Sequence, residues 1–459
     1  MTYYADIAAV RIQSWLARTP KLRGRRGASS LLRDATDADV IAALLPAGVD
    51  INTSAGNIDG VVNLQSQDRS ALIPACASVL SRLRQQIPAV ELQATVSSDA
   101  SDYFTAYREM HVALARGEAI QWQPVVPDVP LAEPCTYCGI DPGVTQRSLS
   151  VEPADKDRLV CADCAARLDA AGRQADRRQA PDVTRRIGLW LGEALADGTE
   201  VKFPDDFTEL AELGGDTHIA TVYLDGNRIG ALFDAVAKSG GKSKKELAEG
   251  IDDATRVALV RALAAILPPH DDIQTNTPLP VPAIPHLVGG DDVLLSVPAP
   301  LGWQFTHSFI NEFAASLAEW ARKAGMAPSG SPPSASAGLV IHHKNHPFAM
   351  VVHDASRALG DAKAIMRGQQ GAAAWVDVSA TGSHVHGPHS STWLTNNWQT
   401  LGKLAQVKPA QRYRLATTDD AQLSDQVNRM ELKAAKTLLN QGTGDLRDSL
   451  SIVKWWNRG

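Results

Sequence analysis

The stretch Ile284-Pro-His-Leu-Val-Gly-Gly-Asp-Asp-Val-Leu-Leu-Ser-Val297 decides the fold of this chain. Two apolar runs, Ile284–Val288 and Val293–Val297, flank a Gly-Gly-Asp-Asp turn, and this pattern predicts a β-hairpin that carries two carboxylates at the edge of a sheet. Adjacent carboxylates repel each other unless a hard cation neutralises them, so the hairpin indicates a divalent-metal site. A solvated turn is the alternative, because Gly and Asp are also ordinary turn residues.

The elements around this hairpin are predicted to form a ferredoxin-like sheet. The predicted order is strand His218–Leu224, helices Ile229–Lys238 and Asp252–Leu267, the hairpin, helix Trp303–Ala324, strand Ala335–His342, helix Phe348–Met366 and strand Ala373–Ser379. This β-α-β-β-α-β order is that of the palm of polymerases and nucleotide cyclases. In such a fold the first strand ends beside the central hairpin, so we expect Asp225 to lie next to Asp291 and Asp292.

Three carboxylates at one point can hold two Mg²⁺ (or Mn²⁺) ions, which would activate a hydroxyl and stabilise a transferring phosphoryl group. The candidate catalytic and metal-binding residues are therefore Asp225, Asp291 and Asp292. Nucleotide-binding candidates surround these acids in the sequence, and they are Gly226, Asn227, Gly289, Gly290 and Lys363. The lysine either reaches a triphosphate or is an ordinary surface residue. A plain turn at Asp225-Gly226-Asn227 is the alternative for the first acid.

A weaker copy of the same order occupies the N-terminus. We expect strand Tyr3–Ala9, helices Val10–Leu16 and Asp37–Leu45, strand Gly60–Leu64, helix Ala71–Ile87 and strand Glu91–Ser97. The hairpin position, Ser54–Asp59, lacks tandem acids. The chain is thus predicted to hold two palms, of which the first is catalytically empty.

Four of the five cysteines form two Cys-x-x-Cys pairs, Cys135/Cys138 and Cys161/Cys164. Two such pairs suit tetrahedral Zn²⁺ with no ligand position left open, so we expect a structural zinc clamp between the palms. Reactive thiol chemistry is the alternative. Cys76 lies in an amphipathic helical run and is expected to be buried.

Composition places limits on the class of protein. The 459 residues are 44% apolar and 21% charged, with a net charge of −6, as in a multidomain globular protein. The sequence contains neither a membrane-length apolar run nor a secretion signal, so we expect a cytoplasmic protein without a membrane partner. Basic clusters at Lys21–Arg26, Arg173–Arg186 and Lys238–Lys245 are either solvated faces or phosphate contacts.

The predicted fold class is α+β, with two ferredoxin-like palms, a zinc-ribbon-like insert and a C-terminal helical bundle. The predicted divisions are 1–120 (first palm), 121–180 (linker and Cys₄ segment), 181–380 (second palm) and 381–459 (helical domain). His342, His343 and His346 end a strand, and His384, His386 and His389 lie in a Gly/Ser-rich segment. All six are interpreted as solvated loop residues, with a metal-binding or acid–base role as the alternative.

Together these motifs resemble the large, polymerase-like subunit of type III CRISPR effector complexes over nearly the whole chain. The resemblance is carried by Tyr4–Ile7 with Leu22–Leu32, by Ser54–Ile58 and by the double Cys-x-x-Cys insert. It is also carried by Leu224–Gly230, Gly289–Asp292, and Gly338–Lys344 with Ala362-Lys363.

The resemblance implies a subunit that condenses ATP into cyclic oligoadenylates when target RNA is bound, with guide RNA and other effector subunits as partners. Asp225, Asp291 and Asp292 would then be the metal and catalytic acids. The family often begins with a His-Asp nuclease domain, which we expect to be absent here. Asn227 stands where a second Asp is common in the family, so the resemblance implies that one metal site is weaker.

Two alternatives to this function remain at the sequence level. One is a free-standing cyclic oligonucleotide synthase, and the other is a non-catalytic scaffold that holds guide and target RNA. A diguanylate cyclase is disfavoured, because such enzymes place Glu-Phe where this chain has Asp292-Val293.

Overall fold

The structure is a computed structural model that describes residues 2–19, 22–56, 60–122, 132–149, 157–176, 182–195, 199–239, 244–268, 278–323 and 333–456. Its contacts divide the chain into two compact units, which are described separately. Unit 1 comprises Met1–Arg185, Ile229–Asp252 and Pro347–Ala349, and unit 2 comprises Arg186–Arg228, Asp253–His346 and Met350–Gly459. None of the described helices is both long enough and apolar enough to span a bilayer.

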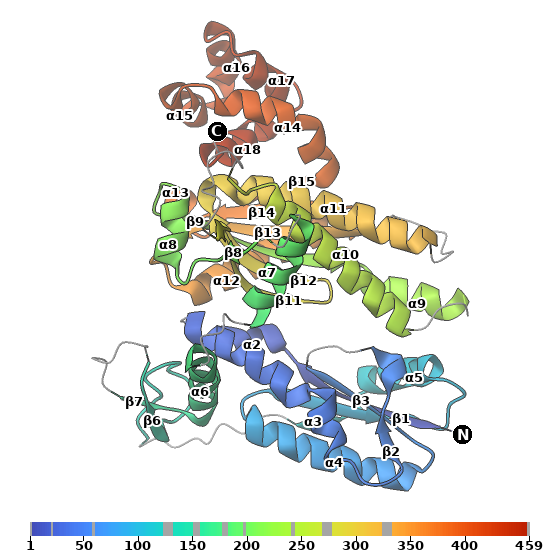
Figure 1. The fold of residues 1–459 in the computed structure, drawn as a ribbon. Coiled ribbons are helices and arrows are strands. Elements are labelled where there is room, and N and C mark those ends of the chain that lie inside the picture. The colour runs from blue at the N-terminus through green and yellow to red at the C-terminus, as the bar shows by residue number, and fades with distance from the viewer. Residues whose placement is uncertain are drawn as a thin grey trace. The chain divides into compact units, whose positions relative to one another are not determined.

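Unit 1 contains a five-stranded sheet with the order β2-β3-β1-β4-β5, in which all neighbours are antiparallel (Figure 1). The strands are β1 (Tyr3–Val10), β2 (Val49–Ile51), β3 (Val61–Ser66), β4 (Glu91–Val96) and β5 (Ile120–Trp122). The helices are α1 (Ile12–Ala17), α2 (Leu22–Thr36), α3 (Ala38–Ala42), α4 (Arg69–Gln86) and α5 (Tyr103–Ala115), with a 3₁₀ turn η1 (Thr53–Ala55). Strands β2-β3-β1-β4 have the ferredoxin-like order, as predicted for the first palm.

The local sequence explains the main elements of this palm. Alternate residues of β1 (Ala5, Ile7 and Ala9) are buried, as in a strand with one face on the core. Helix α4 begins at an Asp68 N-cap and buries an apolar stripe that includes Cys76, as expected. Helix α2 was not predicted, because its many arginines obscure the apolar spacing.

Among the described residues, the first palm has no carboxylate at the positions that correspond to the acids of the second palm. Strand β1 reaches the β2–β3 connection at Ala9, whose N–H donates to the carbonyl of Gly60 at 2.8 Å. By strand register, Ala9 occupies the place that Asp225 holds in the second palm. Residues 57–59 of the predicted hairpin lie outside the described residues.

A buried polar cluster lies between β1, β3, α5 and the start of α10 (Lys244–Ala264) within unit 1. The Asp6 carboxylate accepts hydrogen bonds from Tyr103 Oη at 2.9 Å and from Asn63 Nδ2 at 2.5 Å. Lys244 Nζ donates to Tyr103 Oη at 3.2 Å. Burial raises the pKa of Asp6 and lowers that of Lys244, while the attraction between the two charges opposes both shifts.

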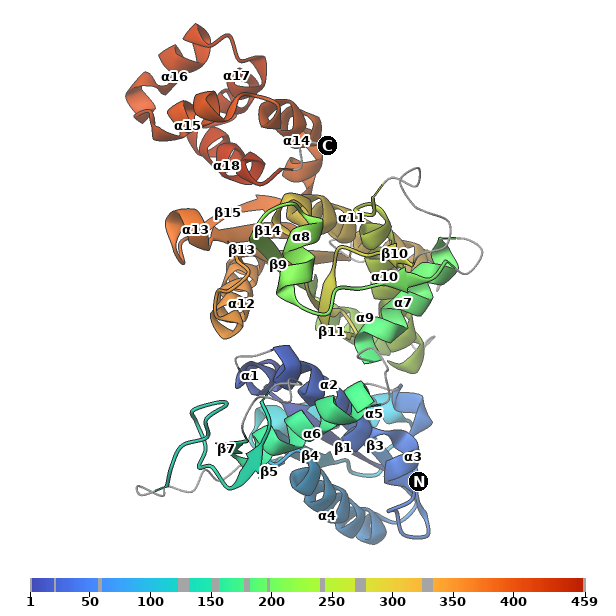
Figure 2. The same cartoon turned by 60° about the vertical axis from the view of Figure 1, so that its left-hand side comes forward.

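The cysteine segment belongs to unit 1 and contains β6 (Thr145–Arg147), β7 (Arg158–Val160) and α6 (Ala162–Asp176). Helix α6 lies against α2 (Figures 1 and 2), and a Cβ at Gly27 would come within 2.0 Å of the Arg167 carbonyl oxygen. The fully buried Arg167 guanidinium lies over the Trp15 ring and pairs with Asp163 at 2.8 Å. The described contacts of this segment therefore fasten it to the first palm.

Unit 2 contains a six-stranded sheet with the order β11-β12-β9-β13-β14-β15 (Figures 1 and 2). The strands are β9 (His218–Asn227), β11 (Ile284–Gly289), β12 (Asp292–Pro298), β13 (Ser334–His343), β14 (Ala372–Asp377) and β15 (Val385–Ser390). Strands β13 and β14 are parallel and the other neighbours are antiparallel. The order β11-β12-β9-β13 is the ferredoxin-like core of the predicted second palm.

The helices of this palm are α7 (Asp182–Ala194), α8 (Phe207–Leu213), α9 (Ile229–Ser239), α11 (Gly302–Lys323), α12 (Phe348–Met366) and α13 (Val378–Thr381), with η3 (Ala299–Leu301) and a small parallel pair, β8 (Val201–Lys202) and β10 (Leu279–Pro280). Of these helices, α9, α11 and α12 were predicted from the sequence, and α7, α8 and α13 were not. Helix α9 and the first residues of α10 belong to unit 1. The core of α11 is an aromatic stripe at helical spacing (Phe305, Phe309 and Phe313), all fully buried.

The C-terminal helices are α14 (Ser391–Ala405), α15 (Pro409–Thr417), α16 (Asp420–Arg429), α17 (Lys433–Leu439) and α18 (Thr443–Lys454), as the predicted bundle requires. The bundle contacts the end of the palm sheet. Trp455 Nε1 donates to the buried Asp377 carboxylate at 2.7 Å, and Trp375 Nε1 donates to Ser451 Oγ at 3.0 Å. The bundle is thus attached through partly buried polar contacts.

The prediction that His386 and His389 are solvated loop residues is wrong. They lie on β15, which pairs with β14, and both rings stack on the buried Trp375. His389 also stacks on Trp393 at 3.8 Å between ring centroids and bonds Asp448 at 2.9 Å. Gly and Pro, which stand at 387 and 388, are poor strand formers, so this edge strand is set by tertiary packing. His342 is likewise buried, and burial lowers its pKa to about 4.

Candidate active site

The central hairpin of the second palm has the predicted geometry. Gly289 pairs with Asp292, so Gly290 and Asp291 are the two residues of the turn. Gly290 has φ +59°, a conformation that glycine adopts at little energetic cost. A Cβ at either Gly289 or Gly290 would meet no atom within 4 Å. The backbone therefore favours glycine at 290, and the space around both glycines is open.

Strand register brings the three predicted acids together. Val293 of β12 pairs with Leu224 of β9, so one residue further along Asp292 lies beside Asp225. Asp291 follows at the turn and is hydrogen-bonded to Asp225. Residues that are more than 60 positions apart in the sequence thus meet at one end of the sheet, because β9 and β12 are central neighbours.

The electrostatics of this end of the sheet are unfavourable without a cation. Burial raises the pKa of Asp291 from 3.8 to about 7, and the negative charges of Asp225 and Asp292 add to the shift. The buried Tyr223 lies on the same face of β9, two residues before Asp225. Its pKa is raised by burial and then by the charges of Asp292 and Asp225. The i, i+2 spacing in a strand could have identified Tyr223 from the sequence.

Lys363 lies at the acids rather than on an unrelated surface. Its Nζ forms an ion pair with Asp225 Oδ2 and donates to the Gly226 carbonyl at 2.9 Å. Helix α12 carries Lys363 and presses against β13, where a Cβ at Gly338 would come within 2.0 Å of the Ala355 carbonyl oxygen. The close approach of this helix to the sheet places the lysine over the end of β9.

Asn227 has a different environment from the acids. It is 6% exposed, and its Nδ2 donates to Ser334 Oγ at 2.9 Å and to the Gln370 carbonyl at 3.3 Å. Ser336 Oγ donates to Asn227 Oδ1 at 3.1 Å. These bonds join β9 to β13 and to the connection between α12 and β14, so the amide holds the strand end in place.

The residues present fit a divalent cation. Three carboxylates and the Gly226 carbonyl supply hard oxygen donors, which Mg²⁺ and Mn²⁺ prefer. Burial raises the pKa of Asp291 and the neighbouring carboxylates add to that shift, while Lys363 supplies one positive charge to Asp225. A metal ion would relieve the remaining repulsion.

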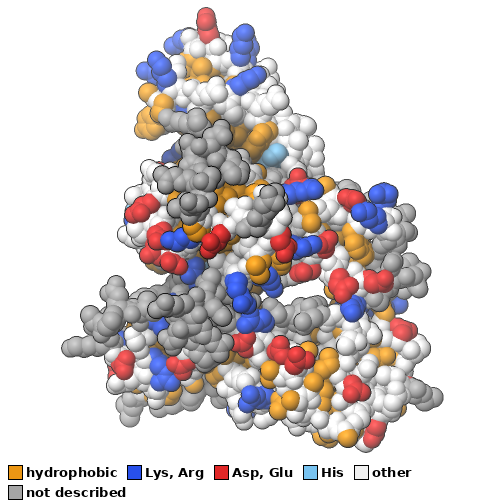
Figure 3. All heavy atoms as spheres, viewed as in Figure 1, with side chains coloured by type: hydrophobic (Ala, Val, Ile, Leu, Met, Phe, Trp, Pro, Cys, Tyr) orange, Lys and Arg blue, Asp and Glu red, His pale blue; other side chains and the backbone are white. Residues whose placement is uncertain are grey.

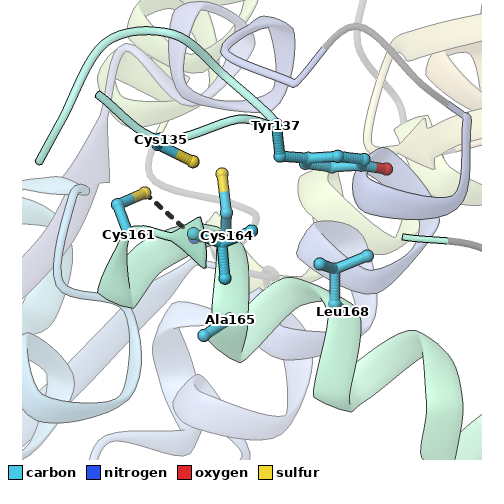
Figure 4. Close-up of a cluster of buried hydrophobic side chains, with 7 residues drawn as sticks. Cys135, Tyr137, Cys161, Cys164, Ala165 and Leu168 are labelled. Carbon is cyan, nitrogen blue, oxygen red and sulfur yellow. Dashed lines mark hydrogen bonds between the residues drawn. The ribbon is translucent and has the colours of Figure 1, made fainter. Parts of the chain in front are cut away.

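The four paired cysteines form a compact cluster in unit 1. Figure 4 shows three of them, Cys135, Cys161 and Cys164. Their sulfur atoms all lie within 4.8 Å of one another, and Cys138 Sγ and Cys161 Sγ are 3.8 Å apart. Tetrahedral Zn²⁺ with Zn–S bonds of about 2.3 Å implies sulfur separations of about 3.8 Å. The Cys164 N–H donates to Cys161 Sγ at 3.4 Å, which orients that sulfur. The cluster could therefore hold the predicted structural zinc.

The face of the molecule shown in Figure 3 carries Lys and Arg side chains interspersed with Asp and Glu. In one predicted basic cluster, Arg25 is not a solvated residue. It is 4% exposed, donates to the Thr19 carbonyl at 3.0 Å and lies over the Phe348 ring at 4.7 Å. Residues 240–243 of another cluster lie outside the described residues.

Comparisons with known proteins agree with this description. Residues 218–370 match the family model for the second palm domain of Cas10/Cmr2. Solved structures of similar fold include a Csm1–Csm4 cassette with pppApA (TM-score 0.55, 12% identity, 99% of this chain and 69% of that chain). A Csm1–Csm4 cassette with cA4 is also similar (TM-score 0.54, 12% identity, 99% of this chain and 69% of that chain). So is an apo Csm1–Csm4 cassette (TM-score 0.52, 12% identity, 99% of this chain and 70% of that chain). At such low identity these matches show the fold alone. No curated protein sequence matches.

Proposed function

We propose, from the premise that this chain is a Cas10-like subunit of type III CRISPR effector complexes, that its second palm joins ATP into cyclic oligoadenylates. The main support for this proposal is that Asp225, Asp291 and Asp292 lie together at one end of the sheet. Structures of similar fold were solved in complex with AMPPNP, pppApA and cA4, which supports adenylate chemistry at this palm.

In the proposed reaction the oxygen of a 3′-hydroxyl forms a bond to the α-phosphorus of a second ATP. The bond to the pyrophosphate oxygen breaks, pyrophosphate leaves, and the hydroxyl proton passes to solvent. Asp225, Asp291 and Asp292 would hold two Mg²⁺ or Mn²⁺ ions. The chemistry that such ions supply is a lower pKa of the attacking hydroxyl and neutralisation of the phosphate charge.

The other predicted residues would bind and orient the nucleotide. The open space at Gly289 and Gly290 allows phosphates to approach the turn, and Lys363 lies within reach of the same end of β9. Asn227 is proposed to act through the backbone that it holds, because its amide is already bonded to β13. The presence of Asn rather than Asp at position 227 is then proposed to affect the geometry of the strand end more directly than the negative charge available to the metal ions.

Guide RNA, target RNA and other type III subunits are the proposed partners, with target RNA as the activator. Zn²⁺ at Cys135, Cys138, Cys161 and Cys164 is proposed to be structural, because all four sulfurs face one point and no ligand position is left for a substrate.

The test is product analysis by mass spectrometry. The full chain is incubated with ATP and Mg²⁺ or Mn²⁺, alone and with co-expressed partner subunits and target RNA. We expect cyclic oligoadenylates with the complete complex and none with an Asp291→Ala/Asp292→Ala variant. An Asp425→Ala variant is the matched control, because Asp425 is an exposed acid on α16.

The other outcomes distinguish the alternatives. Synthesis by the isolated chain without RNA would favour a free-standing synthase. Absence of any adenylate product from the complete, RNA-bound complex would refute the enzymatic proposal and leave a scaffold.

A further inference from the structure

We propose that Lys363 is a built-in counter-ion that holds Asp225 in the metal-free protein and must release it when a divalent cation binds. This inference rests on the proposed metal site, and it adds that metal binding and lysine release are coupled. The role is one of positioning, since Lys363 acts through Asp225.

The contacts of Lys363 coincide with the proposed metal ligands. Its ammonium is bonded to Asp225 Oδ2 and lies 2.9 Å from the Gly226 carbonyl oxygen. Both oxygens are among the hard donors that a divalent ion would use. An ammonium and a metal ion on the same carboxylate and carbonyl repel each other at short range, so metal binding is expected to displace the lysine.

The fold holds the lysine at this position. Helix α12 buries Ala355, Leu359 and Ala362 against the sheet, and the missing side chain at Gly338 permits this close approach. Lys363 follows Ala362 directly and therefore lies at the edge of the helix face that packs on the sheet. The side chains of Lys363 and Asp225 are 29% and 30% exposed, so solvent screens this pair only in part.

The charge balance leaves room for a metal ion. Asp225, Asp291 and Asp292 bring up to three negative charges, and Lys363 brings one positive charge. The lysine thus stabilises the empty site without neutralising it. It also lowers the affinity for a metal ion, because the ion must first break the ion pair.

The coupling has a consequence for the nucleotide. Once a cation holds Asp225, the ammonium is free to pair with a phosphate within reach of its side chain. A bound nucleotide would offer the lysine a new anionic partner and so favour metal binding. Metal and nucleotide are therefore expected to bind with positive cooperativity.

The test measures Mn²⁺ binding to the full chain without nucleotide, by isothermal titration calorimetry and by the electron paramagnetic resonance signal of free Mn²⁺. We expect Lys363→Met to bind Mn²⁺ on the order of tenfold more tightly than wild type, since about 1.4 kcal/mol of competition corresponds to that factor. Lys363→Arg keeps the cation and should bind as wild type does. Lys403→Met, at an exposed position on α14, is the control and should not change binding.

Several outcomes would overturn the inference. Unchanged or weaker Mn²⁺ binding by Lys363→Met, or a lower melting temperature without tighter binding, would show that the lysine does not compete with the metal. If Lys363→Met does not fold, Lys363→Gln replaces it with the same expectation. A triple variant, Asp225→Asn/Asp291→Asn/Asp292→Asn, separates the two proposals. Wild-type binding no stronger than that of the triple variant would overturn the metal site itself, and with it this inference.

Discussion

Asp291→Asn is expected to stabilise the metal-free protein while it abolishes the proposed activity. The ionised Asp291 is held near Asp225 and Asp292 in a partly buried turn, so its charge destabilises the fold when no metal is present. Asparagine has nearly the same shape, carries no charge and can donate a hydrogen bond to Asp225. The substitution therefore removes repulsion without removing contacts.

The magnitude follows from the pKa of Asp291, which burial raises from 3.8 to about 7. A shift of roughly three units at about 1.4 kcal/mol each sets an upper bound of about 4 kcal/mol. Because the side chain is partly exposed and Lys363 offsets part of the negative charge, we expect about 1–2 kcal/mol. For a domain of 150–250 residues this corresponds to a rise of roughly 2–8 °C in Tm.

The direction of the Asp291 pKa shift also predicts how stability depends on pH. A carboxyl with a raised folded-state pKa contributes stability that is fully present below its unfolded pKa, here 3.8, and lost as the pH rises through about 7. Wild type should therefore lose stability between about pH 4 and pH 7 relative to Asp291→Asn. The advantage of the variant should shrink towards pH 4.

The assay is thermal and urea unfolding in EDTA at several pH values, repeated with Mg²⁺. Mg²⁺ should stabilise wild type more than Asp291→Asn, because the ion relieves the same repulsion. Asp425→Asn is the control and should follow the wild-type pH profile. A variant that is less stable than wild type at pH 8 in EDTA, or that has the same pH profile, would refute the reasoning.

Three further predictions concern residues outside the acid cluster. Cys135→Ser/Cys138→Ser should lose bound zinc by elemental analysis and lower the Tm, whereas unchanged zinc content would contradict the clamp. Asn227→Ala should lower the free energy of unfolding by about 1–3 kcal/mol, because Ser334, Ser336 and Gln370 lose their buried partner. An unchanged midpoint of urea unfolding would count against this role of Asn227. Lys244→Met should destabilise unit 1 by about 1–3 kcal/mol, since it removes the hydrogen bond to Tyr103 Oη and the positive charge that offsets Asp6. Asp6→Asn added to that variant should restore part of the loss, and additive losses in unfolding measurements would contradict the coupling.

Much of the fold could be predicted from the sequence because local patterns and topology agree there. The apolar runs on either side of Gly289–Asp292 form β11 and β12, and the predicted order of strands is that of the sheet. Helix α2 and strand β15 were missed, because arginines in the first and Gly, Pro and His in the second hide the pattern. Tertiary packing stabilises both segments against their local propensity.

The sequence by itself determined that tandem acids stand on a hairpin, that Asp225 ends the first strand of the same palm, and that two cysteine pairs can form one metal site. These features follow from residue type, spacing and strand order, which are local or topological properties. Only the tertiary structure decided that Lys363 pairs with Asp225, that Asn227 is bonded across to β13, and that Asp291 has a pKa near 7. The reason is physical: ion pairs, burial and carboxylate repulsion depend on distances between residues far apart in the chain, and these distances exist only once the sheet and α12 have packed together.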